Sequence, residues 1–246
     1  MVSFAAEPIF RLGFFSVTNS FLDTLLVDFI IIGLILSVRN KISLIPGKLQ
    51  TVIETLLQEF YNITYSVAGE NTMKIFPFFT TFFLFILIAN WTGLIPGISA
   101  IGIHEEGKIV PFLRAATSDF NVTLGLALVS VFATHILSLT TLGFKEYISR
   151  YISLNPLNLY IGILELIGEL TKIVSLSFRL FGNIFAGEVV LGTVGTIFAL
   201  IFPLPFLMLE VVVGLVQALV FSMLTMAFMA VLMTSHKAHA KEVSHQ

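Results

Sequence analysis

The chain has 246 residues and a formal net charge of −2; 57% of the residues are hydrophobic and 11% are charged. Soluble domains carry roughly 25% charged residues, so this composition is typical of an integral membrane protein rather than a soluble domain. The chain contains no cysteine, which excludes disulfides and cysteine-ligated metal sites, and it has no basic block that would indicate nucleic-acid binding.

Five segments are candidate membrane-spanning helices, because each is close to or above the roughly 20 mostly apolar residues that a crossing needs. The first is somewhat short and carries Asp23 and Asp28. The last two are separated by FPLPF at 202–206, where two prolines disfavour an uninterrupted helix. We therefore predict an all-α integral membrane protein with a single membrane domain over 1–246 and membrane helices at 21–38, 76–97, 121–141, 157–201 and 206–234.

Residues 47–67 have a different pattern. Apolar residues recur there at helical spacing, and glutamine and glutamate residues fall between them. This pattern predicts an amphipathic helix that lies in the membrane interface rather than crossing the bilayer. The alternative is an ordinary packing helix of the soluble kind, which so apolar a chain disfavours.

The distribution of lysine and arginine between the loops predicts the orientation, because cytoplasmic loops carry an excess of positive charge. With five spans, the side of the N-terminus receives Arg11, Lys108 and Arg114. The other side receives Arg39, Lys41, Lys48, Lys74, Lys145, Arg150, Lys237 and Lys241. We therefore expect the N-terminus outside and the C-terminus inside. Six spans, obtained by splitting 157–201 at Gly182, would nearly remove this difference, so five are preferred.

The segment 157–201 carries polar residues along one face. They are separated by steps that keep them within a narrow arc of a helix, and they are Glu165, Glu169, Lys172, Arg179 and Asn183. The first three lie toward the cytoplasmic end, where both glutamates can reach the lysine at one-turn spacing. They form either an interfacial ion-pair cluster or part of a functional pathway.

Arg179 has no oppositely charged residue one helical turn away, since Ser, Leu, Gly and Asn occupy the neighbouring positions. A charge near the membrane centre costs at least ~2.5–3.5 kcal/mol. Arg179 is therefore either paired with another span, for example through Glu210, or held toward a pathway or an external partner. The second role suits arginine because its side chain stays protonated.

A second polar lining is predicted between the last two helices. Glu188 is roughly half a turn out of phase with Arg179, so the two side chains face apart. Glu210 and Gln217 are seven positions apart and share a face of the following helix. Since intramembrane carboxylates are usual elements of proton relays, these residues indicate a proton pathway.

Four stretches carry a resemblance to a known family. SLSFRLFGNIFAGE at 175–188 resembles the motif around the essential arginine of subunit a of the rotary F-type ATP synthases. Three more stretches resemble other segments of that family in the same order: PFFTTFFLFILIANWTGLIPG at 77–97, TSDFNVTLGLAL at 117–128 and VQALVFSMLTMAFMA at 216–230. The resemblance covers most of the chain from about residue 45 onward.

The resemblance assigns roles to individual residues. Arg179 matches the family's essential arginine. The polar positions that line the channel in this family are matched by Asn183, Glu188 and Gln217. Glu210 stands where some relatives have histidine, a departure that leaves its role open. Residues on the cytoplasmic side or in supporting motifs are Glu165, Glu169, Lys172, Asn90, Asp119 and Asn121.

The resemblance also implies a mechanism. Each subunit of a c-subunit ring carries one carboxyl group, which receives a proton from an outer half-channel assigned to Glu188, Glu210, Gln217 and Asn183. After nearly a full rotation, the carboxyl releases the proton to an inner half-channel. Arg179 stands between the half-channels, attracts the arriving carboxylate and opposes a direct leak. In this family the last two helices form a long, strongly tilted hairpin, which would explain the length of 157–201.

The partners implied are the c-subunit ring, subunit b of the peripheral stalk, the rest of the F1Fo complex and membrane lipid, without nucleic acid, cofactor or metal. The sequence contains no P-loop, so we expect ATP chemistry to belong to partners. The choice between H+ and Na+ stays open. The charged motif and the absence of a presequence favour a bacterial cell membrane over an organelle inner membrane or thylakoid.

Two other classes of function fit the sequence less well. A self-contained secondary transporter also fits intramembrane charge and broken helices, but the sequence shows no internal repeat. A membrane-embedded hydrolase is disfavoured because H-E-x-x-H and G-x-S-x-G motifs do not occur. His135 is isolated in the third span and is interpreted as a packed or hydrogen-bonded residue rather than a metal ligand.

Overall fold

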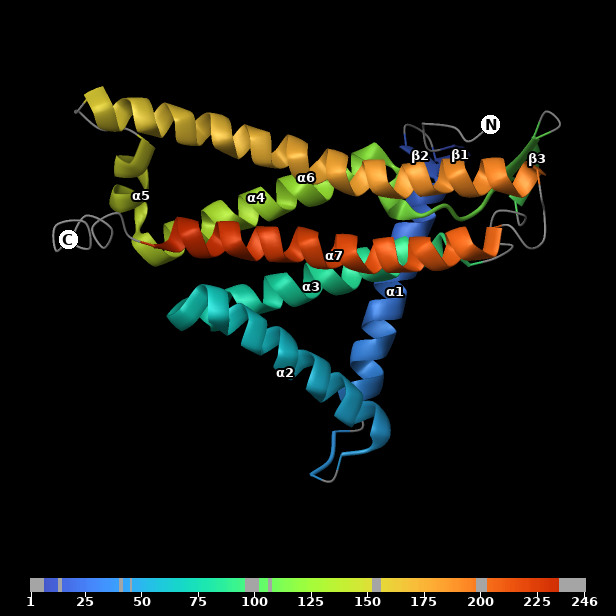
Figure 1. Ribbon diagram of the computed structural model, residues 1–246, viewed down its shortest axis with the longest axis horizontal. Helices are drawn as coiled ribbons and strands as arrows, with labels where there is room; N and C mark the ends of the chain where they lie inside the picture. The colour runs from blue at the N-terminus through green and yellow to red at the C-terminus, as the bar shows by residue number, and fades with distance from the viewer. Residues whose placement is uncertain are drawn as a thin grey trace.

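The computed structural model describes residues 7–12, 15–39, 42–44, 46–95, 102–105, 108–151, 156–197 and 203–234. Its helices are α1 (Asn19–Arg39), α2 (Lys48–Ala68), α3 (Thr72–Thr92), α4 (Phe120–Leu142), α5 (Phe144–Tyr151), α6 (Pro156–Ile197) and α7 (Pro203–Met233). Antiparallel hairpins join β1 (Pro8–Leu12) to β2 (Phe15–Thr18) and β3 (Gly102–Glu105) to β4 (Lys108–Pro111). Helices dominate the structure (Figure 1), which confirms the predicted all-α class.

The boundaries differ from the predicted ones in physically informative ways. The segment predicted at 76–97 starts earlier, as α3 at Thr72, and ends at Thr92. The polar residues of α5 and the short hairpins fall between the apolar runs, so hydropathy gave no signal for them. Residues 96–97 and 198–201, which were predicted to belong to helices, lie outside the described residues.

Within the described residues, four helical segments are long and apolar enough to cross a membrane: Asn19–Arg39, Gln50–Thr92, Phe120–Leu142 and Pro203–Met233. They identify an integral membrane protein with several crossings. α6 is not among them; it carries the five charged residues Glu165, Glu169, Lys172, Arg179 and Glu188. A fifth crossing by α6 therefore stays a prediction.

A sharp reversal divides the apolar segment 50–92 into α2 and α3. The one-turn helix η1 (Gly69–Asn71) connects them, and Gly69 has a φ of 53°. This left-handed conformation favours glycine because it has no Cβ. α2 consequently folds back along α3, where Phe60 and Thr64 are buried, while much of its first half stays exposed.

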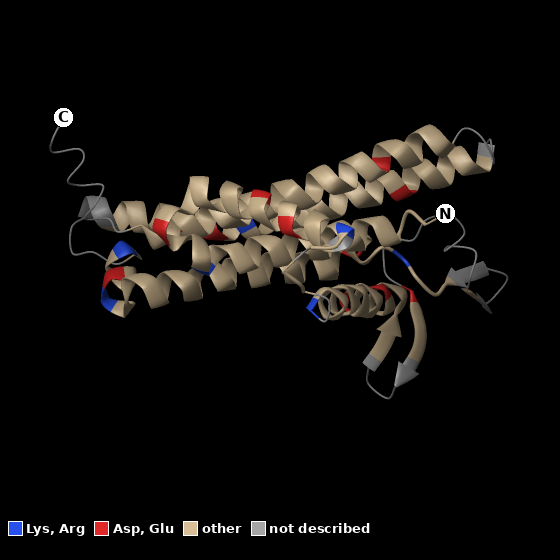
Figure 2. Ribbon diagram, turned by 90° about the horizontal axis from the view of Figure 1, so that it is seen from below, with Lys and Arg blue, Asp and Glu red and all other residues tan. Residues whose placement is uncertain are grey.

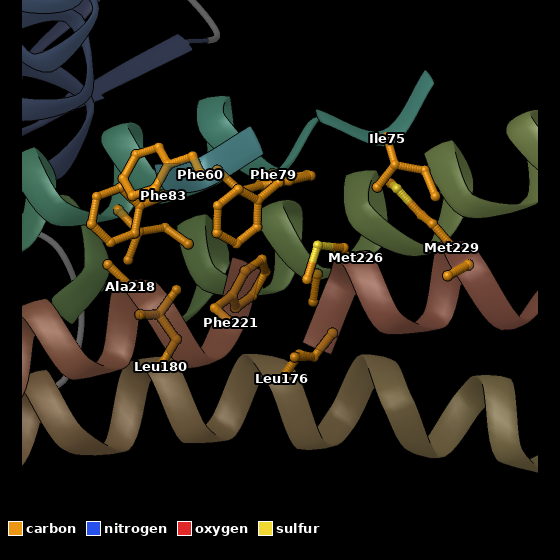
Figure 3. Packing of buried hydrophobic residues seen from close by; sticks show 14 of the residues in the cluster. Phe60, Ile75, Phe79, Phe83, Leu176, Leu180, Ala218, Phe221, Met226 and Met229 are labelled. Atoms are coloured by element: carbon orange, nitrogen blue, oxygen red, sulfur yellow. The ribbon is translucent and has the colours of Figure 1, made fainter. Parts of the chain in front are cut away.

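The core lies where α2, α3, α6 and α7 meet. Figure 3 shows Phe60, Phe79 and Phe83 converging on Phe221 of α7, with Leu180 of α6 closing the cluster from the other side. Phe60 packs edge-on against both α3 rings, with centroids 5.5 and 4.8 Å apart. This core fixes α6 against α7 and so determines which side chains of α6 face outward.

α1 is placed differently from the other long helices. It runs across their common direction rather than alongside them (Figure 1), and only its first half is buried, at Asn19, Ser20, Asp23 and Val27. The rest of α1 exposes apolar side chains such as Phe29, as expected for a lipid-facing helix. The long helices therefore cannot all stand along the membrane normal.

The core predicts a contrast between two phenylalanines. Phe221→Ala removes a ring that is 0% exposed, whereas Phe29→Ala removes one that is 73% exposed. We expect the first change to destabilise the fold by about 3–5 kcal/mol because it leaves a cavity, and the second to have little effect. The measurement is the temperature at which the detergent-solubilised subunit loses its monodisperse gel-filtration peak. Equal temperatures for the two variants would contradict the assigned core.

Candidate functional site

Arg179 lies on the outward face of α6. Phe178 beside it is exposed, whereas Leu176 and Leu180 are buried in the core. The guanidinium Nη2 donates a hydrogen bond to Ser175 Oγ at 3.3 Å, and among the described residues it forms no ion pair. No carboxylate of the described residues thus lies within ion-pair distance of this positive charge, and charged residues are sparse along the long helices (Figure 2).

Asn183, one turn after Arg179, connects α6 to α7. Its Nδ2 donates a hydrogen bond of 2.7 Å to Gln217 Oε1. Asn183 is exposed, while Gln217 is 4% exposed and its Nε2 has no hydrogen-bond partner among the described residues. Through this hydrogen bond the buried Gln217 amide, whose Nε2 remains available as a donor, is linked to Asn183, which lies one turn from Arg179 on α6.

Glu210 is buried in the contact between α7 and α6. It is 7% exposed, and its carboxylate occupies the space above Gly187, where a Cβ would lie 2.0 Å from Oε1. Only a residue without a side chain fits at position 187 with the carboxylate in this place. Among the described residues Glu210 does not pair with Arg179, so the ion pair considered as an alternative is not formed.

Glu188 pairs with Arg114, a residue that the sequence did not single out as functional. The guanidinium donates from Nη2 at 3.0 Å and from Nε at 3.2 Å to the same oxygen, Oε2. The two side chains are 9% and 23% exposed, so the ion pair is largely desolvated. Removing one partner of such a pair leaves an uncompensated buried charge.

Residues 114–119 connect several helices around this pair. Ala116 N donates to Asp23 Oδ2 of α1 at 2.8 Å, and Thr117 Oγ1 donates to Asn90 Oδ1 of α3 at 2.7 Å. Asn90 Nδ2 in turn donates to the Gly214 carbonyl of α7 at 3.0 Å. This chain of hydrogen bonds fixes the part of α7 that lies between Glu210 and Gln217.

The two remaining supporting residues begin a helix. Asp119 Oδ1 accepts hydrogen bonds from the backbone N of Asn121 at 2.9 Å and from its Nδ2 at 3.2 Å. This is the N-cap arrangement that satisfies a free N–H at the start of a helix. In this structure Asp119 therefore caps α4 and Asn121 is the residue whose N–H it caps, and among the described residues neither is hydrogen-bonded to Arg179.

The charged residues near the start of α6 form a separate cluster. Lys172 Nζ lies 2.7 Å from Glu169 Oε1, as its spacing predicts, but Glu165 pairs with Arg150 of α5 at 2.5 Å. His135 Nδ1 is 2.9 Å from the Tyr147 hydroxyl, in agreement with its interpretation as a hydrogen-bonded residue. These contacts tie α4, α5 and α6 together at the end opposite the β-strands (Figure 1).

Comparison with known proteins identifies the family. The model of the ATP synthase A chain family matches residues 21–230. The chain belongs to this family. It is similar to ATP synthase subunit a of Moorella thermoacetica, with 29% identity over 93% of this chain and 96% of the relative. It is also similar to ATP synthase subunit a 2 of Syntrophotalea carbinolica, with 33% identity over 92% of this chain and 89% of the relative.

Family membership confirms the resemblance drawn from the four sequence stretches. The chain is thus a multi-pass membrane subunit of the Fo sector of ATP synthase and part of the F1Fo complex. The residues that the resemblance placed in the outer half-channel lie along one half of the α6–α7 pair: Asn183, Glu188, Glu210 and Gln217. The charged residues near the start of α6 lie apart from them.

The close contact at Gly187 predicts a steric effect. Gly187→Ala would place a methyl group where the Glu210 carboxylate lies, so the end of this side chain would have to move out of its buried position. Gly195→Ala, in the same helix with nothing within 4 Å of its Cβ, is the matched control. We expect only the first variant to lower the thermal midpoint of the solubilised complex, with recovery when Glu210→Asp shortens the acid. A Gly187→Ala variant as stable as the control would contradict this placement.

Proposed function

We propose that this chain is the proton-translocating stator of Fo, and that Arg179 separates two half-channels at the surface facing the c-subunit ring. The observation that supports this most strongly is the position of Arg179, exposed on α6 with a serine hydroxyl as its contact. Holding such a charge in an apolar region is costly. A carboxylate from outside the chain would compensate that charge, and the ring supplies one.

The surface around Arg179 is suited to a membrane-embedded partner. Val174 and Phe178 of α6 are exposed, as are Val212 and Val216 of α7. Exposed apolar side chains thus lie on both helices, with Phe178 directly beside Arg179, which suits a ring of apolar helices with one carboxyl group each. The remaining contacts with lipid and with subunit b of the peripheral stalk involve other surfaces of the subunit.

The polar side chains between α6 and α7 support an outer half-channel. Glu210 and Gln217 are buried at this contact, and Asn183 extends the polar path from Gln217 to the exposed face. Glu188 enters the path with Arg114 as its counter-charge. Protons would pass from this polar region to the ring carboxylate, rotate with it and leave through an inner half-channel on the other side of Arg179.

Arginine is suited to this separation because its guanidinium stays protonated in proteins. It favours the ionised form of an arriving carboxylate, and its fixed charge opposes direct proton transfer between the half-channels. Each proton carries about 2.3 kcal/mol per 100 mV of membrane potential, which a direct leak would dissipate. Both named relatives come from bacteria, in keeping with a bacterial cell membrane.

The course of α1 supports a tilted hairpin. If α1 stands along the membrane normal, α6 and α7 lie strongly inclined to it, because α1 runs across them (Figure 1). The 42 residues of α6 then fit within the bilayer without a break. An inclined α6 would present a long edge to the ring, with Arg179 between the polar contacts at its two ends.

Arg179→Lys tests the need for a permanently charged, planar group. Lysine is a point charge that loses its proton more readily when desolvated. We expect ATP-driven acidification of inverted membrane vesicles to fall roughly tenfold or more, with the complex still assembled. Arg39→Lys, at the exposed end of α1, is the control and should pump normally. Normal coupled pumping by Arg179→Lys would show that a guanidinium is not required.

Glu210→Gln tests the outer half-channel. Glutamine keeps the size and polarity of the side chain but cannot take up and release a proton. We expect passive proton flux through F1-stripped vesicles to fall about tenfold or more, while immunoblots show the subunit retained. Glu70→Gln, on the exposed η1 turn, should leave the flux unchanged. An undiminished flux in Glu210→Gln would assign this acid a structural role.

A further inference from the structure

The short helix α5 contacts a regular stripe of α6. Gly162 and Glu165 meet α5 itself, and Glu169, on the same face of α6, meets His135 of α4, whose other ring nitrogen contacts Tyr147 of α5. At Gly162 the two backbones nearly touch, since a Cβ there would lie 2.3 Å from the Tyr151 carbonyl oxygen. Three consecutive turns of α6 are therefore engaged by α5 and the groups attached to it.

Arg150 of α5 contacts two other helices at once. Its Nε lies 2.5 Å from Glu165 Oε1 of α6, and its Nη1 donates a hydrogen bond of 3.3 Å to the Leu232 carbonyl of α7. The Arg150 and Glu165 side chains are 11% and 20% exposed. A single, largely buried guanidinium of α5 thus connects α6 to the last turn of α7.

A second connection runs through His135 of α4. Its Nδ1 lies 2.9 Å from the Tyr147 hydroxyl of α5, and its Nε2 lies 3.6 Å from Glu169 Oε2 of α6. Lys172 balances Glu169, with its Nζ also 4.6 Å from the ring centre of Phe228 in α7. Three helices, α4, α6 and α7, therefore meet around α5.

These contacts determine where α5 lies, because a helix of eight residues is too short to persist by itself. They also restrain the start of α6. Arg179 follows Glu165 by 14 positions, roughly 21 Å along an uninterrupted helix. A rigid helix that is displaced at its start moves Arg179 as well.

We propose that α5 is a strap that fixes the neighbouring ends of α6 and α7, and that Arg150 is a positioning residue for Arg179. The proposal rests on the proposed function, in which Arg179 has to meet each ring carboxylate in a defined place. A misplacement of about 1 Å between reacting groups can cost about 100-fold in rate. Loosening the strap therefore impairs coupling without removing any group from the proton path.

The test is the ratio of vesicle acidification to ATP hydrolysis in assembled F1Fo. Arg150→Ala and Glu165→Ala should each lower this ratio roughly tenfold. The double variant should be no worse than either single one, because both changes break the same contact. Arg150→Lys should recover most of the ratio by keeping a cation within reach. Lys145→Ala removes an exposed positive charge from the same helix and should leave the ratio unchanged.

A normal ratio of acidification to ATP hydrolysis in both Arg150→Ala and Glu165→Ala would overturn the proposed role of α5. A double variant whose loss is the product of the two single losses would overturn it as well. If Arg150→Ala fails to assemble, Glu165→Gln is judged by the same ratio, since it removes the charge and keeps the size of the side chain. The proposed function fails separately, through normal pumping by Arg179→Lys. A defective Arg179→Lys together with a normal Glu165→Gln rejects the strap alone.

Discussion

The cost of an uncompensated charge in an apolar environment governs the arrangement of this subunit. The acids of α6 each have a basic partner: Glu165 with Arg150, Glu169 with Lys172 and Glu188 with Arg114. Among the described residues, the Arg179 guanidinium has a serine hydroxyl instead of a carboxylate. The same rule supports our proposal that a carboxylate from outside the chain compensates the charge of Arg179.

Two fastening points hold α6 so that Arg179 lies between them. At one end, residues 114–119 join α1, α3, α6 and α7 through an ion pair and buried hydrogen bonds. At the other end, α5 joins α6 to α4 and α7 through Arg150 and the Tyr147–His135 contact. The aromatic core between them presses the apolar side of α6 against α7 (Figure 3) and leaves the opposite side free for a partner.

The sequence predicted what depends on local periodicity. The apolar runs located the helices, and the spacing within 157–201 predicted the ion pair between Lys172 and Glu169. Contacts between distant positions were missed: Arg114 counted only as a loop charge, although it pairs with a residue 74 positions away. Asp23 made the first span look less suited to crossing a membrane. Its carboxylate nevertheless accepts hydrogen bonds from the backbone N–H of Ala116 and the hydroxyl of Thr92. Such partners depend on how helices pack, which no helical period encodes.

In the proposed function, Arg179 acts in proton transfer rather than in holding the fold together. The most direct measurement is ATP-driven acidification of inverted vesicles that carry Arg179→Ala, with assembly of the complex verified in the same membranes. The account predicts a complex that assembles and hydrolyses ATP but does not acidify the vesicles. An assembled complex that pumps at the rate of the unmodified protein would contradict it and make Arg179 a structural charge.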